Sequence, residues 1–122
     1  MSRIVHFEVP ADNPERAQKF YAQALGWEFT QFGGPMAYWL VKTGPNGEAG
    51  IDGGMMKREK AGQGPILVAG VASIDPAIAR ITQAGGTPAL PKMAIPGVGW
   101  AAYFVDTEGN VFGVFQSDEN AK

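Results

Sequence analysis

Apolar residues recur at helical spacing in a first segment, residues 13–26, which begins and ends with helix-capping residues. Asn13 precedes Pro14, and Gly26 follows the apolar stripe formed by Ala17, Phe20, Tyr21, Ala24 and Leu25. Asn is a favoured N-cap, Pro suits the first helical position, and Gly suits the C-terminal stop. The pattern predicts an amphipathic helix whose stripe packs in the core, together with the aromatic ring of Trp27.

A second segment repeats this chemistry. Asp75-Pro76 is predicted to cap a helix, Ile78 and Ile81 carry its apolar stripe, and Gly85-Gly86 ends it.

Strand-like runs surround both helices. In residues 4–9, Val5, Phe7 and Val9 alternate with His6 and Glu8, which places the two sets on opposite faces of one strand. The apolar set should pack on a helix. Further runs cover residues 27–32, 36–43 (after a turn at 33–35), 50–56, 65–71, 87–90, 99–105 and 111–116.

The order strand-helix-strand-strand-strand therefore occurs twice, at an offset of about 60 residues. We expect an α+β fold in which two paired βαβββ modules form a cup-shaped, mostly antiparallel sheet cavity. Within one domain, module one covers about residues 3–57, a linker 58–64, module two 65–116 and a polar tail 117–122.

Composition and net charge exclude several classes of protein and of metal site. The 122 residues are 45% hydrophobic, carry a net charge of -2, and include no cysteine and one histidine, His6. We expect a soluble, cytoplasmic domain without a membrane span, and the mild acidity argues against nucleic-acid partners. One histidine excludes metal sites that need two imidazoles from one chain.

Several short segments, in this order and spacing, resemble the vicinal oxygen chelate superfamily, the glyoxalase/bleomycin-resistance/dioxygenase group. They are residues 5–9 (VHFEV), Phe20-Tyr21, Leu25-Gly26-Trp27, Ala84-Gly85-Gly86 and residues 106–110 (DTEGN). The resemblance covers nearly the whole chain and implies the paired βαβββ fold, a small-molecule ligand and a homodimer.

Metal enzymes of that superfamily take ligands from the first and last strands of each module. Carried over to this chain, these positions are His6 and Asp52 in module one, and Ile66 and Gly113 in module two. Neither Ile66 nor Gly113 can bind a metal through its side chain, so the ligand set is incomplete. We therefore expect no cofactor, with a divalent metal at His6 and Asp52 as the alternative.

Candidate site residues follow from position and chemistry. His6, Glu8 and Asp52 are candidates for acid–base catalysis. Aspartate is disfavoured in strands, so Asp52 serves either the site or a turn or bulge. Of Tyr38 and Trp39, alternation sends one to the cup and the other to the helix layer. Candidate ligand-binding residues are Tyr38, Trp39, Met56, Trp100 and Tyr103.

The preferred function is a glyoxalase-like small-molecule-binding protein, or an enzyme of unassigned reaction, without a complete metal site. One alternative is a metal-dependent lyase or isomerase related to lactoylglutathione lyase. Another is a drug-sequestering resistance protein that resembles bleomycin-binding proteins.

Overall fold

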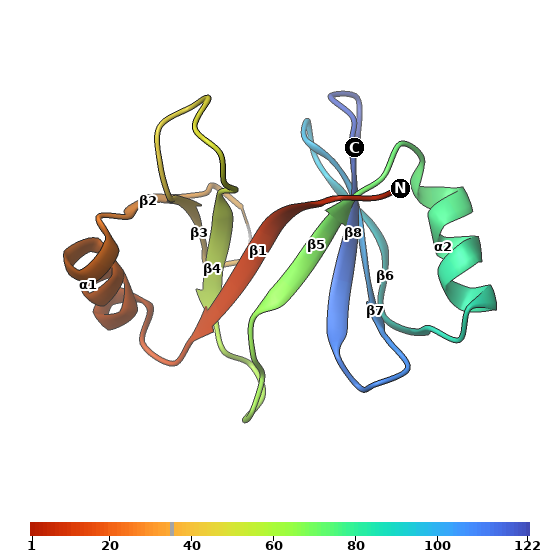
Figure 1. Ribbon diagram of the computed structural model, residues 1–122, viewed down its shortest axis with the longest axis horizontal. Helices are drawn as coiled ribbons and strands as arrows, with labels where there is room; N and C mark the ends of the chain where they lie inside the picture. The colour runs from red at the N-terminus through yellow and green to blue at the C-terminus, as the bar shows by residue number, and fades with distance from the viewer. Residues whose placement is uncertain (35) are drawn as a thin grey trace. The chain divides into compact units, whose positions relative to one another are not determined.

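The computed structural model describes residues 1–34 and 36–122, and in these residues eight strands and two helices follow the order βαβββ twice (Figure 1). The elements are β1 Ile4–Ala11, α1 Pro14–Leu25, β2 Glu28–Gln31, β3 Tyr38–Lys42, β4 Gly53–Lys57, β5 Ile66–Gly70, α2 Ile74–Gln83, β6 Thr87–Ile95, β7 Gly99–Val105 and β8 Val111–Ser117. The predicted α+β class is confirmed.

The chain divides into two compact units. The N-terminal unit is His6–Pro65, and the C-terminal unit is Ile66–Lys122 together with Met1–Val5. Residues 1–5 join the C-terminal unit because they lie along β5, where the Gly70 amide donates to the Arg3 carbonyl over 2.9 Å. Strand β1 thus begins in one unit and ends in the other.

In the N-terminal unit the strand order is β2-β3-β4-β1, with β1 parallel to β4 and the other pairs antiparallel. Helix α1 lies on one face. The core on that face contains the buried Ala11, Val41 and Met55, and Phe7 and Val9 pack against it. Alternation in β1 therefore predicted the helix-facing side correctly for Phe7 and Val9.

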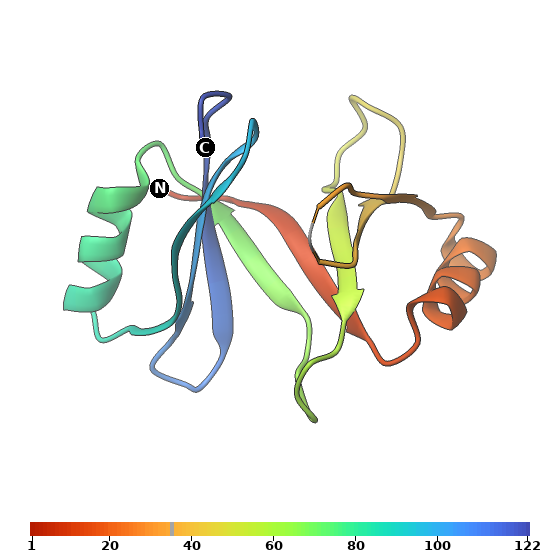
Figure 2. The same ribbon diagram turned by 180° about the vertical axis from the view of Figure 1, so that it is seen from behind.

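The C-terminal unit repeats this plan with the order β5-β8-β7-β6, in which β5 and β8 are parallel and the other pairs antiparallel. Figure 2 shows α2 lying along one side of these strands. Ile74, Ala102, Phe104 and Val114 are the buried core beneath it. In both units antiparallel pairs outnumber parallel ones, as predicted.

Helix α1 begins and ends where the sequence predicted. The Asn13 side chain accepts from the Arg16 amide, and Gly26 adopts φ 75° at the C-cap. The predicted burial of its whole stripe is wrong, because Phe20 is 61% exposed and Leu25 is 58% exposed. Tyr21, by contrast, stacks on Trp27 with ring centroids 4.8 Å apart.

The predicted cap of α2 is also wrong. The N-cap position is Ser73, and Asp75 lies inside the first turn. The side-chain oxygen of Gln116, on β8, accepts from the Ile74 amide over 2.9 Å and so satisfies the helix start. Asp75 instead forms an ion pair with Lys92 on β6.

Two strands differ from their predicted bounds by three residues or more at one end. The run predicted over 50–56 starts as β4 only at Gly53, and Asp52 lies in the preceding loop. The run predicted over 87–90 continues as β6 to Ile95, with register shifts between Pro88 and Met93. Strand β6 is an edge strand, which explains why it tolerates its prolines. Pro35, in the predicted turn before β3, lies outside the described residues.

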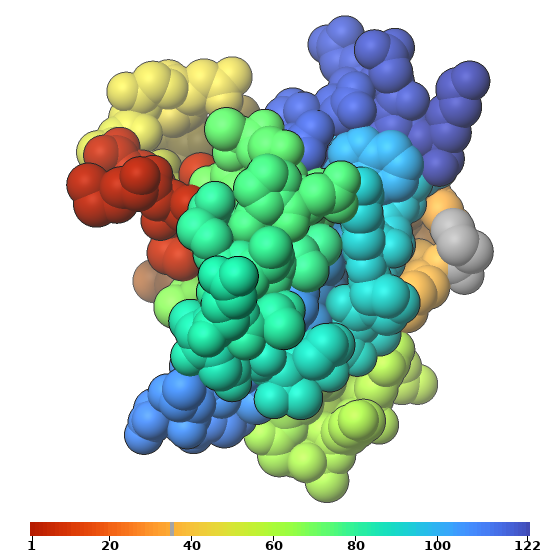
Figure 3. All heavy atoms as spheres, turned by 90° about the vertical axis from the view of Figure 1, so that its right-hand side faces the viewer, coloured from red at the N-terminus to blue at the C-terminus, as the bar shows by residue number. Residues whose placement is uncertain are grey.

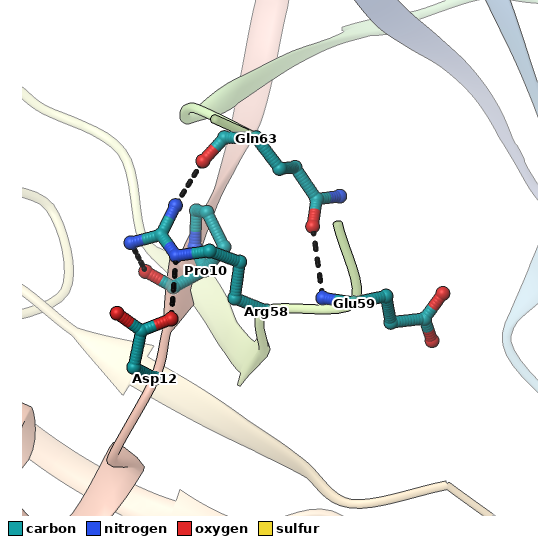
Figure 4. Close-up of polar contacts among 5 residues, drawn as sticks. All are labelled: Pro10, Asp12, Arg58, Glu59 and Gln63. Carbon is teal, nitrogen blue, oxygen red and sulfur yellow. Dashed lines mark hydrogen bonds and ion pairs between the residues drawn. The ribbon is translucent and has the colours of Figure 1, made fainter. Parts of the chain in front are cut away.

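The linker after β4 is folded back onto the end of β1 by Arg58 (Figure 4). The Arg58 guanidinium contacts the Asp12 carboxylate at 2.9 Å and donates to the Gln63 carbonyl, and the Gln63 side chain accepts from the Glu59 amide. The segment predicted as the linker between the modules is therefore a loop held by hydrogen bonds.

The C-terminal tail is likewise anchored. Gly97 donates its amide to the Ala121 carbonyl, and Figure 3 shows the last residues beside the turn between β6 and β7. The Trp100 indole donates to the Asp118 carboxylate over 3.0 Å, which lowers the pKa of Asp118.

Candidate functional site

The far face of the N-terminal unit, meaning the sheet face opposite α1, carries most of the predicted acid–base residues. Strands β3, β4 and β1 lie side by side, with Leu40 beside Gly54 and Gly54 beside Glu8. Tyr38 lies beside Met56 in the same registers. Because side chains alternate along each strand, His6, Glu8, Tyr38 and Met56 all point away from α1.

Three of these side chains form one hydrogen-bonded chain. The Tyr38 hydroxyl donates to Glu8 Oε2 over 2.8 Å, and His6 Nε2 lies 2.8 Å from the same hydroxyl oxygen. Glu8 is only 6% exposed, and it is the one charged residue in the buried class among the residues the structure describes. Since a buried polar group needs hydrogen-bond partners, this bond helps to stabilise the carboxylate in its place.

Gly54 makes this arrangement sterically feasible. The Tyr38 ring crosses β4 diagonally to reach Glu8 and His6, and a methyl group on Gly54 would overlap the Tyr38 hydroxyl. On its other side, Tyr38 meets the edge of the Phe32 ring, with centroids 6.3 Å apart. The glycine is therefore a close-approach position rather than a simple weakening of the strand.

The ring of His6 is held in its neutral form. Burial lowers the pKa of His6, because the charged imidazolium loses hydration there, and the negative charges of Glu8 and Asp52 offset part of this effect. At neutral pH the site therefore contains an uncharged imidazole that is hydrogen-bonded to a phenol.

Asp52 lies at the base of a loop rather than in the hydrogen-bonded chain. Its Oδ1 accepts from the Thr43 amide at 2.9 Å and from the Thr43 hydroxyl at 3.3 Å. Of the two explanations weighed for this aspartate, the local turn is the one that the contacts describe. Its charge still acts on His6 through space.

The ligand set for a metal is incomplete in the residues that the structure describes, where no three His, Cys, Asp or Glu side chains come together closely enough to hold an ion. The Asp52 carboxylate is bonded to Thr43, and the His6 Nε2 is bonded to Tyr38. These residues do not fit a divalent metal.

The predicted ligand-binding aromatics occupy different places. Trp39 packs into the core beneath α1, and Trp100 packs into the core beneath α2. Tyr103 lies on the face of the C-terminal unit opposite α2, where its ring packs against Gly113. Of the five candidate ligand-binding residues, Tyr38 and Met56 share the far face with His6.

The strand registers correct one pairing between the modules. Glu8 lies beside Gly54 in the N-terminal unit, and Val68 lies beside Gly113 in the C-terminal unit. Gly113 therefore corresponds to Gly54, and its predicted correspondence to Asp52 is wrong by two residues. By the same registers, Ile66 corresponds to His6, and Ala101 corresponds to Tyr38.

Sequence reasoning missed two residues of the site. Gly54, which admits Tyr38, is not among the candidate residues predicted from the sequence, although a double glycine inside a strand can signal a close approach. Thr43, which holds Asp52, carried no sequence signal, because the contact depends on how the loop between β3 and β4 closes.

Comparison with known proteins agrees with this fold. Residues 3–44 match the family model described as bleomycin resistance protein-like N-terminal. A hypothetical protein from Bacillus halodurans C-125 is 13% identical with a TM-score of 0.74, over 99% of this chain and 98% of that chain. A comparison with curated proteins gave no match.

Two further solved structures are similar. A variant of methylmalonyl-CoA epimerase from Streptomyces coelicolor, in complex with 2-nitronate-propionyl-CoA, is 15% identical with a TM-score of 0.74, over 100% of this chain and 99% of that chain. A glyoxalase/bleomycin resistance protein/dioxygenase superfamily member from Vibrio splendidus 12B01 is 17% identical with a TM-score of 0.69, over 96% and 100%. The predicted resemblance is confirmed: the chain has the fold of the vicinal oxygen chelate superfamily.

No helix among the described residues is both long and apolar enough to cross a membrane.

Proposed function

We propose that this chain is a glyoxalase-like small-molecule-binding protein that takes its ligand on the far face of the N-terminal unit, without a complete metal site. The observation that carries the proposal is the hydrogen-bonded chain of His6, Tyr38 and Glu8, on a sheet face whose corresponding positions in the C-terminal unit are apolar.

The C-terminal unit supports this argument. It builds the same βαβββ scaffold with Ile66, Val68 and Ala101 at the three corresponding positions. Replacing buried, hydrogen-bonded polar partners together by apolar groups of similar shape is often neutral or stabilising for the fold. The polar residues of the N-terminal unit are therefore explained better by a ligand than by folding.

The residues beside the hydrogen-bonded chain of His6, Tyr38 and Glu8 favour one kind of ligand. Met56 and Leu40 lie beside Tyr38 and Gly54 on the far face, and Leu40 is 44% exposed. A ligand with an apolar body and one polar group would match this surface, with the apolar part on Leu40 and Met56 and the polar group at the hydrogen-bonded chain.

A ligand screen followed by thermal unfolding tests the proposal. A ligand that binds the folded state raises the melting temperature. We expect the shift to be lost in Tyr38→Phe and retained in Tyr21→Phe, a matched change in the α1 core. Equal shifts in both variants would contradict the proposed site.

Metal content is tested separately, by elemental analysis of protein without a polyhistidine tag after dialysis against divalent ions. We expect no stoichiometric metal. An ion that is retained by the wild type and lost in His6→Ala would overturn this part of the proposal and favour the lyase or isomerase alternative.

A proton-transferring enzyme is the second candidate, favoured by one observation: the Tyr38 hydroxyl links two groups that can exchange protons, Glu8 and His6. The similar epimerase structure suggests acyl thioesters with an acidic α-proton as trial substrates. Deuterium uptake from D2O at that carbon, abolished by Glu8→Gln, would support the enzyme.

A further inference from the structure

The direction of the hydrogen bonds fixes where the protons lie. An ionised carboxylate only accepts, so the Tyr38 proton points to Glu8 Oε2. The Tyr38 oxygen must then accept from His6, and the 2.8 Å contact therefore requires a proton on His6 Nε2. In a neutral imidazole the other nitrogen, Nδ1, is then a lone-pair acceptor.

The second nitrogen of His6, Nδ1, is not fully buried. His6 makes one hydrogen bond, through Nε2, to the residues that the structure describes. In that same part of the chain, no buried side-chain nitrogen or oxygen atom lacks a hydrogen-bond partner. His6 Nδ1 has no such partner, so it is not fully buried and keeps some exposure to solvent.

We propose that His6 Nδ1 is the ligand-accepting atom of this site, and that the ligand group bound there is a hydrogen-bond donor, an ammonium or a hydroxyl. The inference rests on the proposed binding function. The Tyr38 hydroxyl proton and the His6 Nε2 proton are both used in hydrogen bonds among His6, Tyr38 and Glu8. His6 therefore has no free N–H group to donate to a carboxylate, phosphate or carbonyl oxygen of a ligand.

Of the two donors, the ammonium is favoured by charge. The carboxylates of Glu8 and Asp52 both act electrostatically on the His6 ring, and both favour a positive charge there. An alcohol gains the hydrogen bond alone, whereas an alkylammonium gains the hydrogen bond and this attraction.

Nitrogen NMR of the His6 ring tests the proton assignment. The chain has one histidine, so ¹⁵N-labelled protein without a tag gives one imidazole, with no ambiguity of assignment. At about pH 8, well above the ordinary histidine pKa, we expect protonated Nε2 and unprotonated Nδ1. In Tyr38→Phe the preference for this tautomer should weaken. A proton on Nδ1 in the wild type would overturn the inference.

Three probes with the same six-carbon chain test the ligand class: hexylammonium, hexanol and hexanoate. We expect the Nδ1 signal to respond to hexylammonium at the lowest concentration, to hexanol at higher concentration, and not to hexanoate. Asp52→Asn, which keeps an oxygen for Thr43, should weaken hexylammonium binding several-fold and leave hexanol unchanged.

A response to hexanoate alone, or no Nδ1 response to either donor, would overturn the ligand class. These outcomes are separate from failure of the binding function, because the ligand screen detects any ligand of the far face whether or not it touches Nδ1. A screen hit that depends on Tyr38 but leaves Nδ1 unchanged would retain the proposed function and reject this inference.

Discussion

Glu8 and Val68 hold the same register position in two sheets of the same strand order, and each lies beside a glycine. In the N-terminal unit that glycine is crossed by a tyrosine whose hydroxyl reaches the carboxylate. In the C-terminal unit a tyrosine ring also packs on the glycine, yet the residue beside it is Val68. Both units share the scaffold, and the hydrogen-bonded chain of His6, Tyr38 and Glu8 lies on the far face of the N-terminal unit.

This difference between the two units distinguishes residues that the fold requires from residues that serve a function. Both units place a tyrosine ring on this glycine, but from different positions, because Tyr103 lies directly beside Gly113 whereas Tyr38 reaches Gly54 diagonally. The βαβββ scaffold forms without the carboxylate and the imidazole, since the C-terminal unit has Val68 and Ile66 at those positions. Residues that the two units share therefore relate to stability, and residues that differ are the candidates for ligand chemistry.

The largest effect is expected from Gly54→Ala. The added methyl group displaces Tyr38, which breaks the hydrogen bonds to His6 and Glu8. We expect loss of ligand binding and a loss of about 1–3 kcal/mol in the free energy of unfolding, measured by urea titration. The matched control is Gly113→Ala, where the new Cβ would lie 2.8 Å from Tyr103 Cε2. It should cost similar stability but leave the His6 ring signal unchanged.

A double variant of Tyr38 and Glu8 tests whether these polar residues are needed for the stability of the fold. Tyr38→Phe alone removes the hydroxyl donor from buried Glu8 and should cost about 1–3 kcal/mol of unfolding free energy. Adding Glu8→Val introduces the residue type of Val68, the counterpart of Glu8, and should restore stability to within about 1 kcal/mol of the wild type, without restoring ligand binding. If the double variant is less stable than Tyr38→Phe, the comparison between the units fails.

Stability should depend on pH through His6. Its pKa is lower in the folded state than the ordinary 6.5, so the unfolded chain binds the extra proton first as pH falls. The free energy of unfolding should therefore decrease as pH falls through 6.5 toward the folded pKa, by at most about 1.4 kcal/mol per pH unit. His6→Gln should remove this decrease. A slope that is identical in the variant would assign it to other groups.

The smallest effect is expected on the outer side of α1. Phe20 is 61% exposed, so Phe20→Ser should change the free energy of unfolding by no more than about 0.5 kcal/mol. A larger loss in chemical denaturation would mean that the predicted helix stripe is buried in solution, as the sequence pattern indicated.

Local chemistry explains which parts of the fold the sequence could predict. The start of α1 depends on Asn13 and Pro14, which act on residues three or four positions away. The start of α2 depends on Gln116, which is 42 positions from Ile74 in the chain. An Asx-Pro pair therefore predicts the N-cap correctly for α1 and wrongly for α2.

The part of the site that could be predicted is the part that follows from the alternation of side chains along a strand. Alternation placed His6 and Glu8 together, and it required that either Tyr38 or Trp39 join them. It could not choose between the two, because that choice depends on the register of β3 against β4. The role of Gly54 depends on the same register and on the diagonal path of the Tyr38 ring.

The division of β1 between the two units has a consequence for synthesis on the ribosome. Residues 7–11 of β1 pair with β4, which ends at Lys57, whereas residues 1–5 lie along β5, which begins at Ile66. The chain emerges from its N-terminus at about 5–20 residues per second. Residues 1–5 are therefore made before the strand that they lie along, and they cannot pair with it until residue 70 has emerged.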